Sequence, residues 1–258
     1  MTIPTLIYCA DGNRRFAEIA LRRGLQYGAQ LPNKVYFPPY FTDQNWKTPN
    51  RSGYMAAVEK YRPALATVLD WELPEQLPLV LDWAEEASQW VQDSIIIIPK
   101  VVGGIKQLPR AINGKPVRLG YSAASTFSST PCPVSEFRGW SVHCLGGGPG
   151  NQMDLARKLD VQSADGNYIQ LMARKYVQFY SPGTRARNRH WPRLKSDADI
   201  HIEWDAPYVA FELTCIAVPM AWSGASGQSI WERQLIFLEE MGITPSHVQH
   251  RLFQESIA

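Results

Sequence analysis

Several residue types that take part in catalysis stand where short apolar segments of the chain end. Asp70, Lys100 and Asp165 end three such segments, and residues 120–122 and 146–148 end two more with glycine. The amine of a strand-end lysine can form a Schiff base with a carbonyl substrate, and a glycine-rich turn can surround a phosphate. An aspartate in this position is also a common helix N-cap, and glycines are common in turns. Because five apolar segments end in residues of these types, they nevertheless indicate a single site, provided that the fold brings the segment ends together.

The segments that must position these residues alternate between apolar runs and helical patterns. Near-continuous apolar strands that alternate with helices indicate a parallel sheet covered on both faces. The number of repeats favours a closed (β/α)8 TIM barrel over an open sheet, and barrel enzymes keep their chemistry at the carboxyl ends of the strands. We expect strands over residues 5–10, 25–31, 66–71, 94–100, 116–122, 140–147 and 160–165, and helices over residues 13–23, 51–61, 77–91, 104–112, 152–159 and 168–175.

The C-terminal part of the chain has a different pattern. PYVAFELTCIAVPMAW and SIWERQLIFLEEMG predict two helices, the first interrupted by Pro219, and SGASGQ predicts the turn that joins them. We therefore expect an α/β protein with a single TIM-barrel domain over residues 1–206. Residues 207–258 are expected to form a short helical extension that closes the barrel or contacts a second copy in a homodimer.

Composition and charge exclude several classes of protein. Of 258 residues, 45% are hydrophobic and 19% are charged, which excludes a disordered chain. The 26 Lys and Arg against 24 Asp and Glu give a net charge of +2, which does not indicate a polybasic membrane binder. The longest aliphatic run, residues 95–98, is too short to span a membrane, and the first residues lack the features of a signal peptide. We expect a cytoplasmic protein with free, mostly buried thiols, because its 4 cysteines form no C-x-x-C pair.

Three stretches of the chain resemble a known enzyme family. LGGGPGNQMDLARKLDVQSADGNYIQLMARKYVQFYSPGT (residues 145–184) is similar to the catalytic stretch of the tRNA-guanine transglycosylases, nearest the archaeal branch. It has a glycine-rich turn, a helix, a strand that ends in Asp, and a helix with an Ala-Arg pair, here Ala173 and Arg174. TPNRSGYMAAVEKYRPALATVLDWE (residues 48–72) and LVLDWAEEAS (residues 79–88) resemble the segments around the family's base-recognition Asp. The superfamily includes DNA deazaguanine transglycosylase-like proteins, and the resemblance covers roughly residues 40–184.

The resemblance implies catalytic roles for two carboxylates. Asp165 matches the family's nucleophile, which displaces a purine base from its sugar and holds the sugar as a covalent intermediate. Asp43, which follows Thr42 in FTDQNW, matches a carboxylate in a Thr-Asp loop that transfers protons to and from the bases. The chain departs from the glycine-rich continuation of that motif. Asp11, in CADGNRR, is therefore a competing candidate for the second carboxylate.

The resemblance also implies how the base is recognised. Asp70 matches the residue that accepts hydrogen bonds from guanine, whose N1–H and N2–H2 are adjacent donors. Lys100 stands where the family has a Gln; because lysine only donates, either the preferred base carries an extra acceptor or Lys100 contacts a phosphate. Gly120, followed by Tyr121, matches the position whose backbone N–H contacts the ring oxygen. The glycines that would let the backbone approach the ribose are Gly146, Gly147 and Gly148.

The chain departs from the family in its metal ligands and in its contacts to nucleic acid. The family's zinc site needs three Cys and one His, whereas Cys215 is the only cysteine after residue 184, so we expect no metal and no other cofactor. TRARNRHWPRLK (residues 184–195) carries Arg185, Arg187 and Arg189 beside Trp191. A basic stretch with an aromatic residue can bind phosphates and stack a base, so these residues are the candidate nucleic-acid contacts.

Taken together, these residues predict an enzyme that exchanges guanine for a 7-deazapurine base in tRNA or DNA, or that hydrolyses a related glycosidic bond. Its partners would be the nucleic acid and a purine or 7-deazapurine base. Two alternatives stay open. A different barrel enzyme, such as a Schiff-base lyase or a phosphosugar enzyme, would use Lys100. A non-catalytic relative that binds nucleic acid or a partner subunit would have its pocket filled by Trp46 or Trp71.

Overall fold

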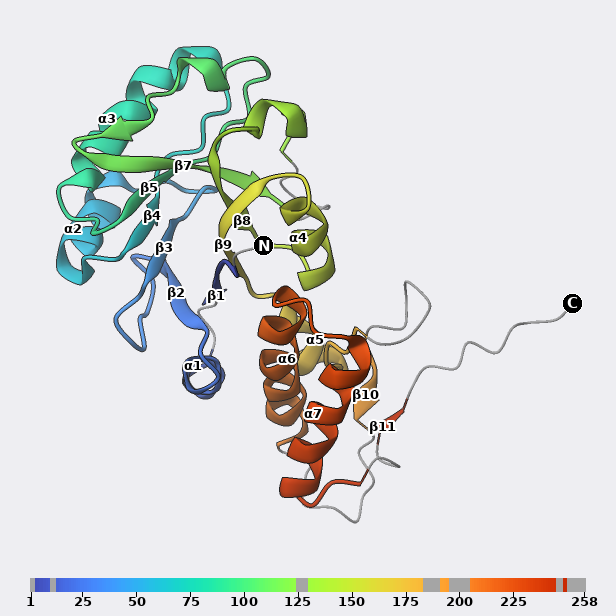
Figure 1. Cartoon of the computed structure of the whole chain (residues 1–258). Coiled ribbons are helices and arrows are strands. Elements are labelled where there is room, and N and C mark those ends of the chain that lie inside the picture. Colours follow the sequence, from blue (N-terminus) through green and yellow to red (C-terminus); the bar gives the residue numbers. More distant parts are fainter. Residues whose placement is uncertain are drawn as a thin grey trace, which may run out of the picture. The chain divides into compact units, whose positions relative to one another are not determined.

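The chain folds into two compact units (Figure 1). The computed structural model describes residues 3–9, 13–123, 130–182, 191–194, 205–244 and 248–249. The barrel unit comprises Pro4–Ala17 and Gly24–Asn167, and the helical unit comprises Met1–Ile3, Glu18–Arg23 and Tyr168–Ala258. Asp43, Asp70, Lys100 and Asp165 all belong to the barrel unit, so these candidate site residues lie within one unit.

The barrel unit contains a closed parallel β-barrel. Its nine-stranded sheet has the order β5-β4-β3-β2-β1-β9-β8-β7-β6, and β5 also pairs with β7. Because only β6 (Ala111–Ile112) is antiparallel, the other eight strands close into a parallel ring. They are β1 (Thr5–Cys9), β2 (Gln26–Leu31), β3 (Phe41–Gln44), β4 (Leu65–Thr67), β5 (Ser94–Ile97), β7 (Lys115–Ser122), β8 (Ser141–Leu145) and β9 (Asp160–Gly166). With its surrounding helices this ring is the predicted (β/α)8 TIM barrel.

Two segments of the barrel unit differ from the sequence-based expectation. Asp43 was expected in a loop but lies on β3, whose 4 residues are too few and too polar to form a recognisable apolar run. The helix expected over residues 104–112 is wrong, because a short 3-10 turn, η2 (Ile105–Gln107), is followed there by β6. Asn113 and Gly114, with φ angles of 47° and 76°, form the two-residue turn between β6 and β7. An Asn-Gly pair favours that turn because both residues tolerate a positive φ.

Helices follow the strands that carry the candidate carboxylates. The barrel unit contains α2 (Arg51–Tyr61), α3 (Leu77–Ser88) and α4 (Pro149–Ala156), with 3-10 turns η1 (Pro74–Gln76) and η3 (Val134–Phe137), while α1 (Arg14–Arg22) has residues in both units. The side chain of Asn50 caps α2 by accepting a hydrogen bond from the N–H of Gly53. Arg51 links α2 to α3 through ion pairs with Asp82 and Glu86. These contacts fix the outer layer behind β3 and β4.

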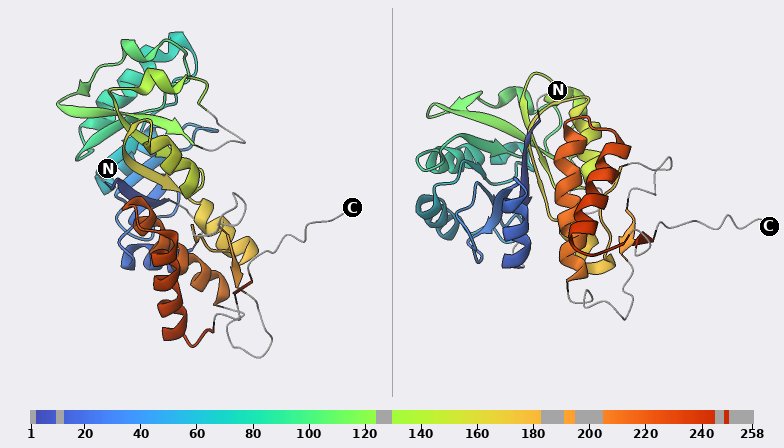
Figure 2. Two further views of the ribbon diagram at one scale, coloured as in Figure 1. Left: turned by 45° about the vertical axis from the view of Figure 1, so that its right-hand side comes forward. Right: turned by 60° about the horizontal axis from the view of Figure 1, so that its bottom comes forward.

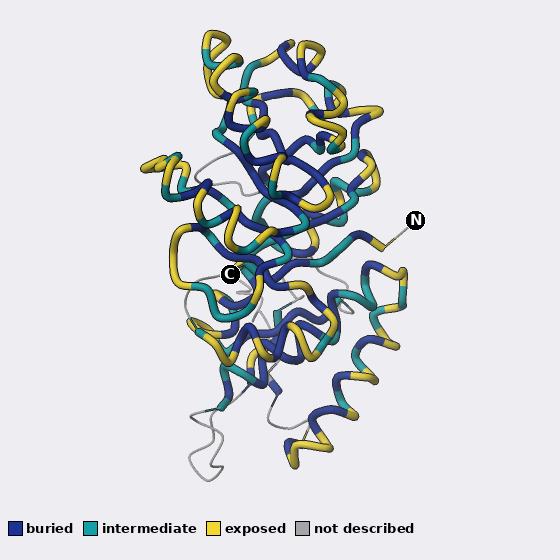
Figure 3. Tube along the Cα trace, turned by 90° about the vertical axis from the view of Figure 1, so that its left-hand side faces the viewer, coloured by how far each residue is buried: buried dark blue, intermediate teal, exposed yellow. Residues whose placement is uncertain are grey.

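The interior of the barrel has an apolar side and a polar side. Ile7, Phe41, Leu65, Ile96 and Ile98 form the apolar cluster, from β1, β3, β4, β5 and the residue after it. The polar side consists of residues from β7, β8 and β9, namely Arg118, His143 and Ser163. Figure 3 shows buried residues along the inner segments of the chain and exposed residues concentrated on its outer turns and helices.

A β-bulge separates the polar pair on β8 and β9 from the residues before it. Val142 pairs with Val161, but the next residue, His143, pairs with Ser163, so that Gln162 is an extra residue in β9. A bulge of this kind redirects the side chains that follow it. Because a shift of one residue moves side chains to the opposite face of a strand, the bulge places Ser163 beside His143.

The helical unit contains α5 (Tyr168–Tyr176), α6 (Ala206–Trp222) and α7 (Gly227–Glu240), with a short antiparallel pair of β10 (Arg193–Leu194) and β11 (Val248–Gln249). α6 and α7 lie side by side in both views of Figure 2. α6 continues through Pro219 and is not interrupted there. Its Glu212 accepts hydrogen bonds from Arg22 and Arg23, each at 2.8 Å. In the described part of the chain, no helix has the length and apolar character needed to cross a membrane.

Candidate active site

A pocket of about 290 Å³ opens among the carboxyl ends of the barrel strands. The residues that line it include Asp43 from β3, Gly146 just after β8, and Asp165 at the end of β9. Asp70 and Lys100, which follow β4 and β5, also line it. The fold therefore brings together all three predicted aspartates and the lysine, at the end of the barrel where enzymes of this architecture place their chemistry.

Asp165 is held at one of its two carboxylate oxygens. Oδ1 lies 3.2 Å from Nε2 of His143 and 3.3 Å from the backbone nitrogen of Gly146. The side-chain amide of Gln152 donates to the backbone carbonyls of both Asp165 and Gly146, each at 2.8 Å. The glycine turn after β8 and the end of β9 are thereby tied together, so the carboxylate has a fixed position in the pocket.

Asp43 lies in the same pocket with an unusual protonation equilibrium. Burial, opposed by a 2.7 Å hydrogen bond from the Thr67 hydroxyl and reinforced by the negative charges of Asp165 and Asp70, raises the pKa of Asp43 from 3.8 to about 7. A carboxyl group with a pKa near neutrality exists in both protonation states under physiological conditions. It can therefore act as a general acid and then as a general base.

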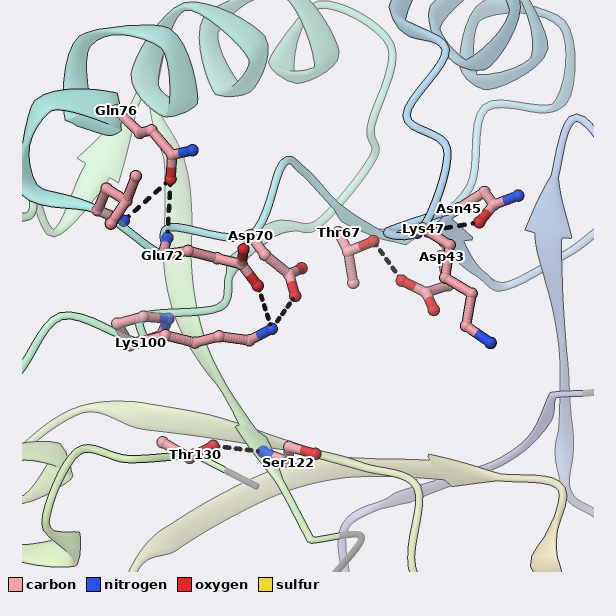
Figure 4. Close-up of polar contacts among 12 residues, drawn as sticks. Asp43, Asn45, Lys47, Thr67, Asp70, Glu72, Gln76, Lys100, Ser122 and Thr130 are labelled. Atoms are coloured by element: carbon pink, nitrogen blue, oxygen red, sulfur yellow. Dashed lines mark hydrogen bonds and ion pairs between the residues drawn. The ribbon is translucent and has the colours of Figure 1, made fainter. Parts of the chain in front are cut away.

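Asp70 and Lys100 form an ion pair at the ends of adjacent strands. Figure 4 shows the amine of Lys100 pointing at the carboxylates of Asp70 and Glu72. Nζ of Lys100 lies 2.9 Å from Oδ2 of Asp70 and 2.8 Å from Oε1 of Glu72. The pair is kept in register by a bridge between Trp71 and Pro99 and by a 2.8 Å hydrogen bond from the N–H of Lys100 to the carbonyl of Trp71. The two side chains thus present an ammonium group next to a carboxylate.

Burial and charge act in opposite directions on this pair. Burial raises the pKa of Asp70, although Lys100 opposes the rise through its hydrogen bond and its charge. Burial also disfavours the charge of Lys100, but the hydrogen bonds and charges of Asp70 and Glu72 outweigh it and raise the pKa of Lys100. Lys100 is therefore an ammonium group at neutral pH, a donor and not a nucleophile.

Neither tryptophan near the pocket fills it. Trp71 is fully buried, and its Nε1 donates to the carbonyl of Leu73 at 2.9 Å. Trp46 lines the pocket but is 41% exposed, with Nζ of Lys100 5.7 Å and Nζ of Lys47 5.3 Å from its ring centre. An exposed indole beside a polar pocket offers a surface on which a base can stack.

Four of the predicted substrate-binding residues are not among the residues that line the pocket within the described ranges. Gly120 is buried deeper in the barrel, where a Cβ would lie 2.7 Å from Cγ1 of Ile98. Tyr121 packs edge-on against Phe137, with ring centres 5.0 Å apart. The other two shape the turn after β8: Gly147 has a φ of 77°, and Gly148 is the N-cap of α4.

The predicted nucleic-acid contacts belong to another part of the chain. Arg185, Arg187 and Arg189 lie outside the described residues, as does Asp11, the alternative second carboxylate. Trp191 is half-buried in the helical unit, with ring centres 5.4 Å from Tyr168 and 5.5 Å from Tyr180. In this aromatic cluster Trp191 packs against neighbouring side chains of its own unit.

His143 and Ser163 are site residues that the sequence analysis did not single out. Both are fully buried, and they join through a 2.8 Å hydrogen bond between Nδ1 of His143 and Oγ of Ser163. The signal in the sequence is a polar residue at the centre of an apolar strand, in WSVHCL and in DVQSAD. Such a residue is costly to bury unless it is hydrogen-bonded, so its position within the strand points to an interior network.

The structure contains no candidate metal centre within its described ranges. No group of three or more His, Cys, Asp or Glu side chains there has the arrangement needed to hold a metal ion. All 4 cysteines are free thiols. Burial raises the pKa of Cys132 to about 11 and that of Cys144 to about 12, with smaller contributions from the charges of Glu136 and Asp165. These thiols are protonated at neutral pH and therefore unreactive.

Comparison with known proteins identifies the family of the chain. No curated protein matches the chain. A family model described as a family of unknown function (DUF6610) matches residues 19–199, more than half of the chain. The matched residues include Asp43, Asp70, Lys100 and Asp165, that is, every charged residue that lines the pocket in the described part of the chain. The chain therefore belongs to the DUF6610 family.

Proposed function

We propose that this protein is a transglycosylase-like enzyme that exchanges guanine for a 7-deazapurine base in nucleic acid, through a covalent intermediate on Asp165. The observation that carries the proposal is the pairing of two different carboxyl groups in one pocket. Asp165 is held by two hydrogen-bond donors, whereas burial raises the pKa of Asp43 to about 7. Environments that give two carboxyl groups different properties are typical of a nucleophile and a proton-transfer group at a glycosidic bond.

In the first half of the reaction, a carboxylate oxygen of Asp165 forms a bond to C1′ of the nucleotide. The bond between C1′ and the guanine nitrogen breaks, and its electron pair leaves with the base, which takes the proton of Asp43. In the second half, Asp43 removes a proton from the incoming base. That base then attacks C1′, the ester bond to Asp165 breaks, and Asp165 and Asp43 return to their starting states.

Asp70 and Lys100 are the proposed base-recognition groups. The edge of guanine presents the acceptor O6 next to the donors N1–H and N2–H2. The ion pair of Asp70 and Lys100 presents the complementary order, with a donor at Nζ beside a carboxylate. Adenine presents a donor and an acceptor in the reverse order, so the same pair disfavours it.

The two alternative functions have less support. A Schiff-base lyase needs a neutral amine on Lys100, but the pKa of Lys100 is raised because of its hydrogen bonds to Asp70 and Glu72. A non-catalytic relative was expected to have its pocket filled by a tryptophan, whereas Trp71 is buried outside the pocket and Trp46 stands partly exposed at it. We further propose that the protein acts in the cytoplasm, where free thiols persist.

The proposed function is tested by incorporation of radiolabelled guanine into bulk tRNA and, separately, into duplex DNA. We expect the wild type to label one of these polymers and the variant Asp165→Asn to label neither. The matched control is Asp160→Asn, which removes the same charge from the exposed opposite end of β9 and should retain full labelling. Loss of labelling in both variants would show a general defect of the strand, and labelling by Asp165→Asn would contradict the role of Asp165 as nucleophile.

A further inference from the structure

A continuous chain of hydrogen bonds crosses the barrel interior and ends on Asp165. Arg118 of β7 donates from Nη2 to Asp93 at 2.7 Å and from Nε to Oγ of Ser94 at 3.2 Å. Its third contact, from Nη1 to Oγ of Ser163, is 3.1 Å. Ser163 in turn contacts Nδ1 of His143 at 2.8 Å, and Nε2 of His143 contacts Oδ1 of Asp165 at 3.2 Å.

The chemistry of the groups sets the direction of this chain. A guanidinium group carries only donors, so Oγ of Ser163 must accept from Arg118. The Ser163 hydroxyl hydrogen can then point at Nδ1 of His143, and we infer that Nδ1 accepts it. If Nδ1 is an acceptor, the proton of the neutral imidazole is on Nε2, where it points at the carboxylate of Asp165. The opposite tautomer would place a lone pair of Nε2 against an ionised carboxylate.

The imidazole ring is also fixed by packing. His143 is 0% exposed, and its ring lies 4.7 Å from the ring centre of Phe41 with an interplanar angle of 30°. Both ring nitrogens have a partner, so rotation of the ring would leave two buried polar atoms without hydrogen bonds. One orientation of His143, and one position of its Nε2–H, are therefore strongly favoured.

We propose that His143 is a positioning residue for Asp165 and that Arg118, acting through Ser163, sets the tautomer of His143. In this way His143 determines which carboxylate oxygen of Asp165 attacks the sugar. The proposal rests on the proposed function in so far as Asp165 is taken as the nucleophile. His143 and the N–H of Gly146 both bind Oδ1, and Oδ2 accepts no hydrogen bond from the described residues. Oδ2 is then the oxygen that forms the bond to C1′, while two donors hold Oδ1 and orient the group.

The protonation of His143 can be measured without any assay of activity. The ¹⁵N NMR shifts of the imidazole nitrogens distinguish the Nε2–H tautomer from the Nδ1–H tautomer and from the imidazolium ion. We expect His143, assigned by loss of its signals in His143→Gln, to carry its proton on Nε2 when the imidazole ring is neutral. In Ser163→Ala the hydroxyl that selects this tautomer is gone, so we expect a detectable fraction of Nδ1–H. A neutral His143 ring with its proton on Nδ1 in the wild type would overturn the proposal.

Base-exchange kinetics then separate positioning from a purely structural role. We expect His143→Leu to lower kcat by about 10- to 100-fold, with KM for guanine changed by less than about threefold, because the base contacts Asp70 and Lys100 and not His143. His143→Gln, whose amide can donate near the position of Nε2, should recover part of kcat. Equal losses in both variants, or a change in KM alone, would overturn the proposal.

The two tests fail in different ways. If NMR finds the Nε2–H tautomer and the wild type exchanges no base, the geometry around Asp165 stands and the proposed function fails. If base exchange depends on Asp165 but His143 carries its proton on Nδ1, the proposed function stands and the role of His143 fails. If His143→Leu does not fold, Ser163→Ala supplies the kinetic comparison, with a smaller loss of kcat expected and unchanged kcat contradicting the proposal.

Discussion

The hydroxyl of Thr67 donates to Oδ1 of Asp43 over 2.7 Å, and its oxygen accepts a hydrogen bond of 3.0 Å from the backbone N–H of Gln44. The N–H of Gln44 can only donate, so the Thr67 hydroxyl hydrogen is directed at the carboxyl group. A donor aimed at a carboxylate favours the ionised form, which is why Thr67 lowers the pKa of Asp43 while burial raises it. This single contact therefore adjusts the pKa of Asp43, the proposed proton-transfer group of the pocket.

The first prediction concerns that hydroxyl. Thr67→Val keeps the shape of the side chain but removes the donor, so the pKa of Asp43 should rise above about 7. The shift can be followed by a ¹³C NMR titration of the Asp43 carboxyl carbon. The control is Thr42→Val on β3, because the hydroxyl of Thr42 contacts the hydroxyl of Tyr54 on α2 at 3.3 Å and no hydrogen bond from it to Asp43 is seen in the described residues. An equal shift in both variants, or a fall in the pKa, would contradict the assignment.

The second prediction concerns the stability of the fold as a function of pH. Because the pKa of Asp43 is raised in the folded state, the folded protein binds this proton more tightly than the unfolded chain does. The loss of stability caused by ionising Asp43 in the folded protein is absent below 3.8, the pKa in the unfolded chain, and is complete above about 7. Asp43→Asn should therefore gain free energy of unfolding relative to the wild type as pH rises through this window, by at most about 4 kcal/mol for the shift from 3.8 to about 7.

Chemical denaturation of both proteins at several pH values measures this gain. Subtracting the free energy of unfolding of the wild type from that of the variant at each pH removes the contribution of the groups that titrate in both proteins. A difference that does not change between pH about 4 and pH about 7, or that falls as pH rises, would show that Asp43 titrates normally in the folded protein.

The third prediction concerns base recognition. Lys100→Met removes the donor next to Asp70 and the positive charge that opposes the rise in the pKa of Asp70. We expect KM for guanine to rise by about tenfold to a hundredfold, since a hydrogen bond to a charged group contributes about 1.5–3 kcal/mol. Lys106→Met, an exposed lysine on η2, is the matched control and should leave KM unchanged. Comparable KM values for the wild type and Lys100→Met would show that Lys100 does not contribute to recognition of the base.

The fourth prediction concerns Gly120. A Cβ at this position would lie 2.7 Å from Cγ1 of Ile98 and 2.9 Å from Cδ1 of Leu145, so Gly120→Ala should destabilise the barrel by about 1–3 kcal/mol. Gly150 in α4 has nothing within 4 Å of such a Cβ, and Gly150→Ala should instead stabilise the helix by about 0.5–1 kcal/mol. Thermal unfolding of both variants checks the pair. A Gly120→Ala variant as stable as the wild type would show that the interior can adapt to the extra methyl group.

The barrel could be predicted from the sequence because its strands are mostly continuous apolar runs. The run of four isoleucines at residues 95–98, in and just after β5, is such a stretch, and strands covered on both faces require such stretches. β3 could not be predicted in this way, because FTDQ places polar residues on both faces at the rim of the barrel. The expected helix over residues 104–112 failed for a different reason, since the Asn113-Gly114 pair that follows it favours a hairpin turn and the expectation did not take this pair into account.

The candidate site could be predicted where it lies at strand ends and not where it lies inside the barrel. Asp70, Lys100 and Asp165 follow apolar runs, and parallel strands bring such ends together. His143 and Ser163 sit in mid-strand, where their partners come from other strands and depend on the bulge at Gln162. The polar residues in mid-strand indicate an interior network, but the sequence pattern carries no sign of that bulge and therefore does not predict which side chains pair behind Asp165.

The central claim is that Asp165 forms a covalent bond to the sugar, and its most direct test is to find that bond. The wild type is incubated with the polymer that it labels, released guanine is removed, and the protein is denatured, digested and mapped by mass spectrometry. We predict a ribosyl or deoxyribosyl adduct on the peptide that contains Asp165, present in Asp160→Asn and absent in Asp165→Asn. An adduct on another residue, or base exchange without any adduct under these conditions, would contradict the account.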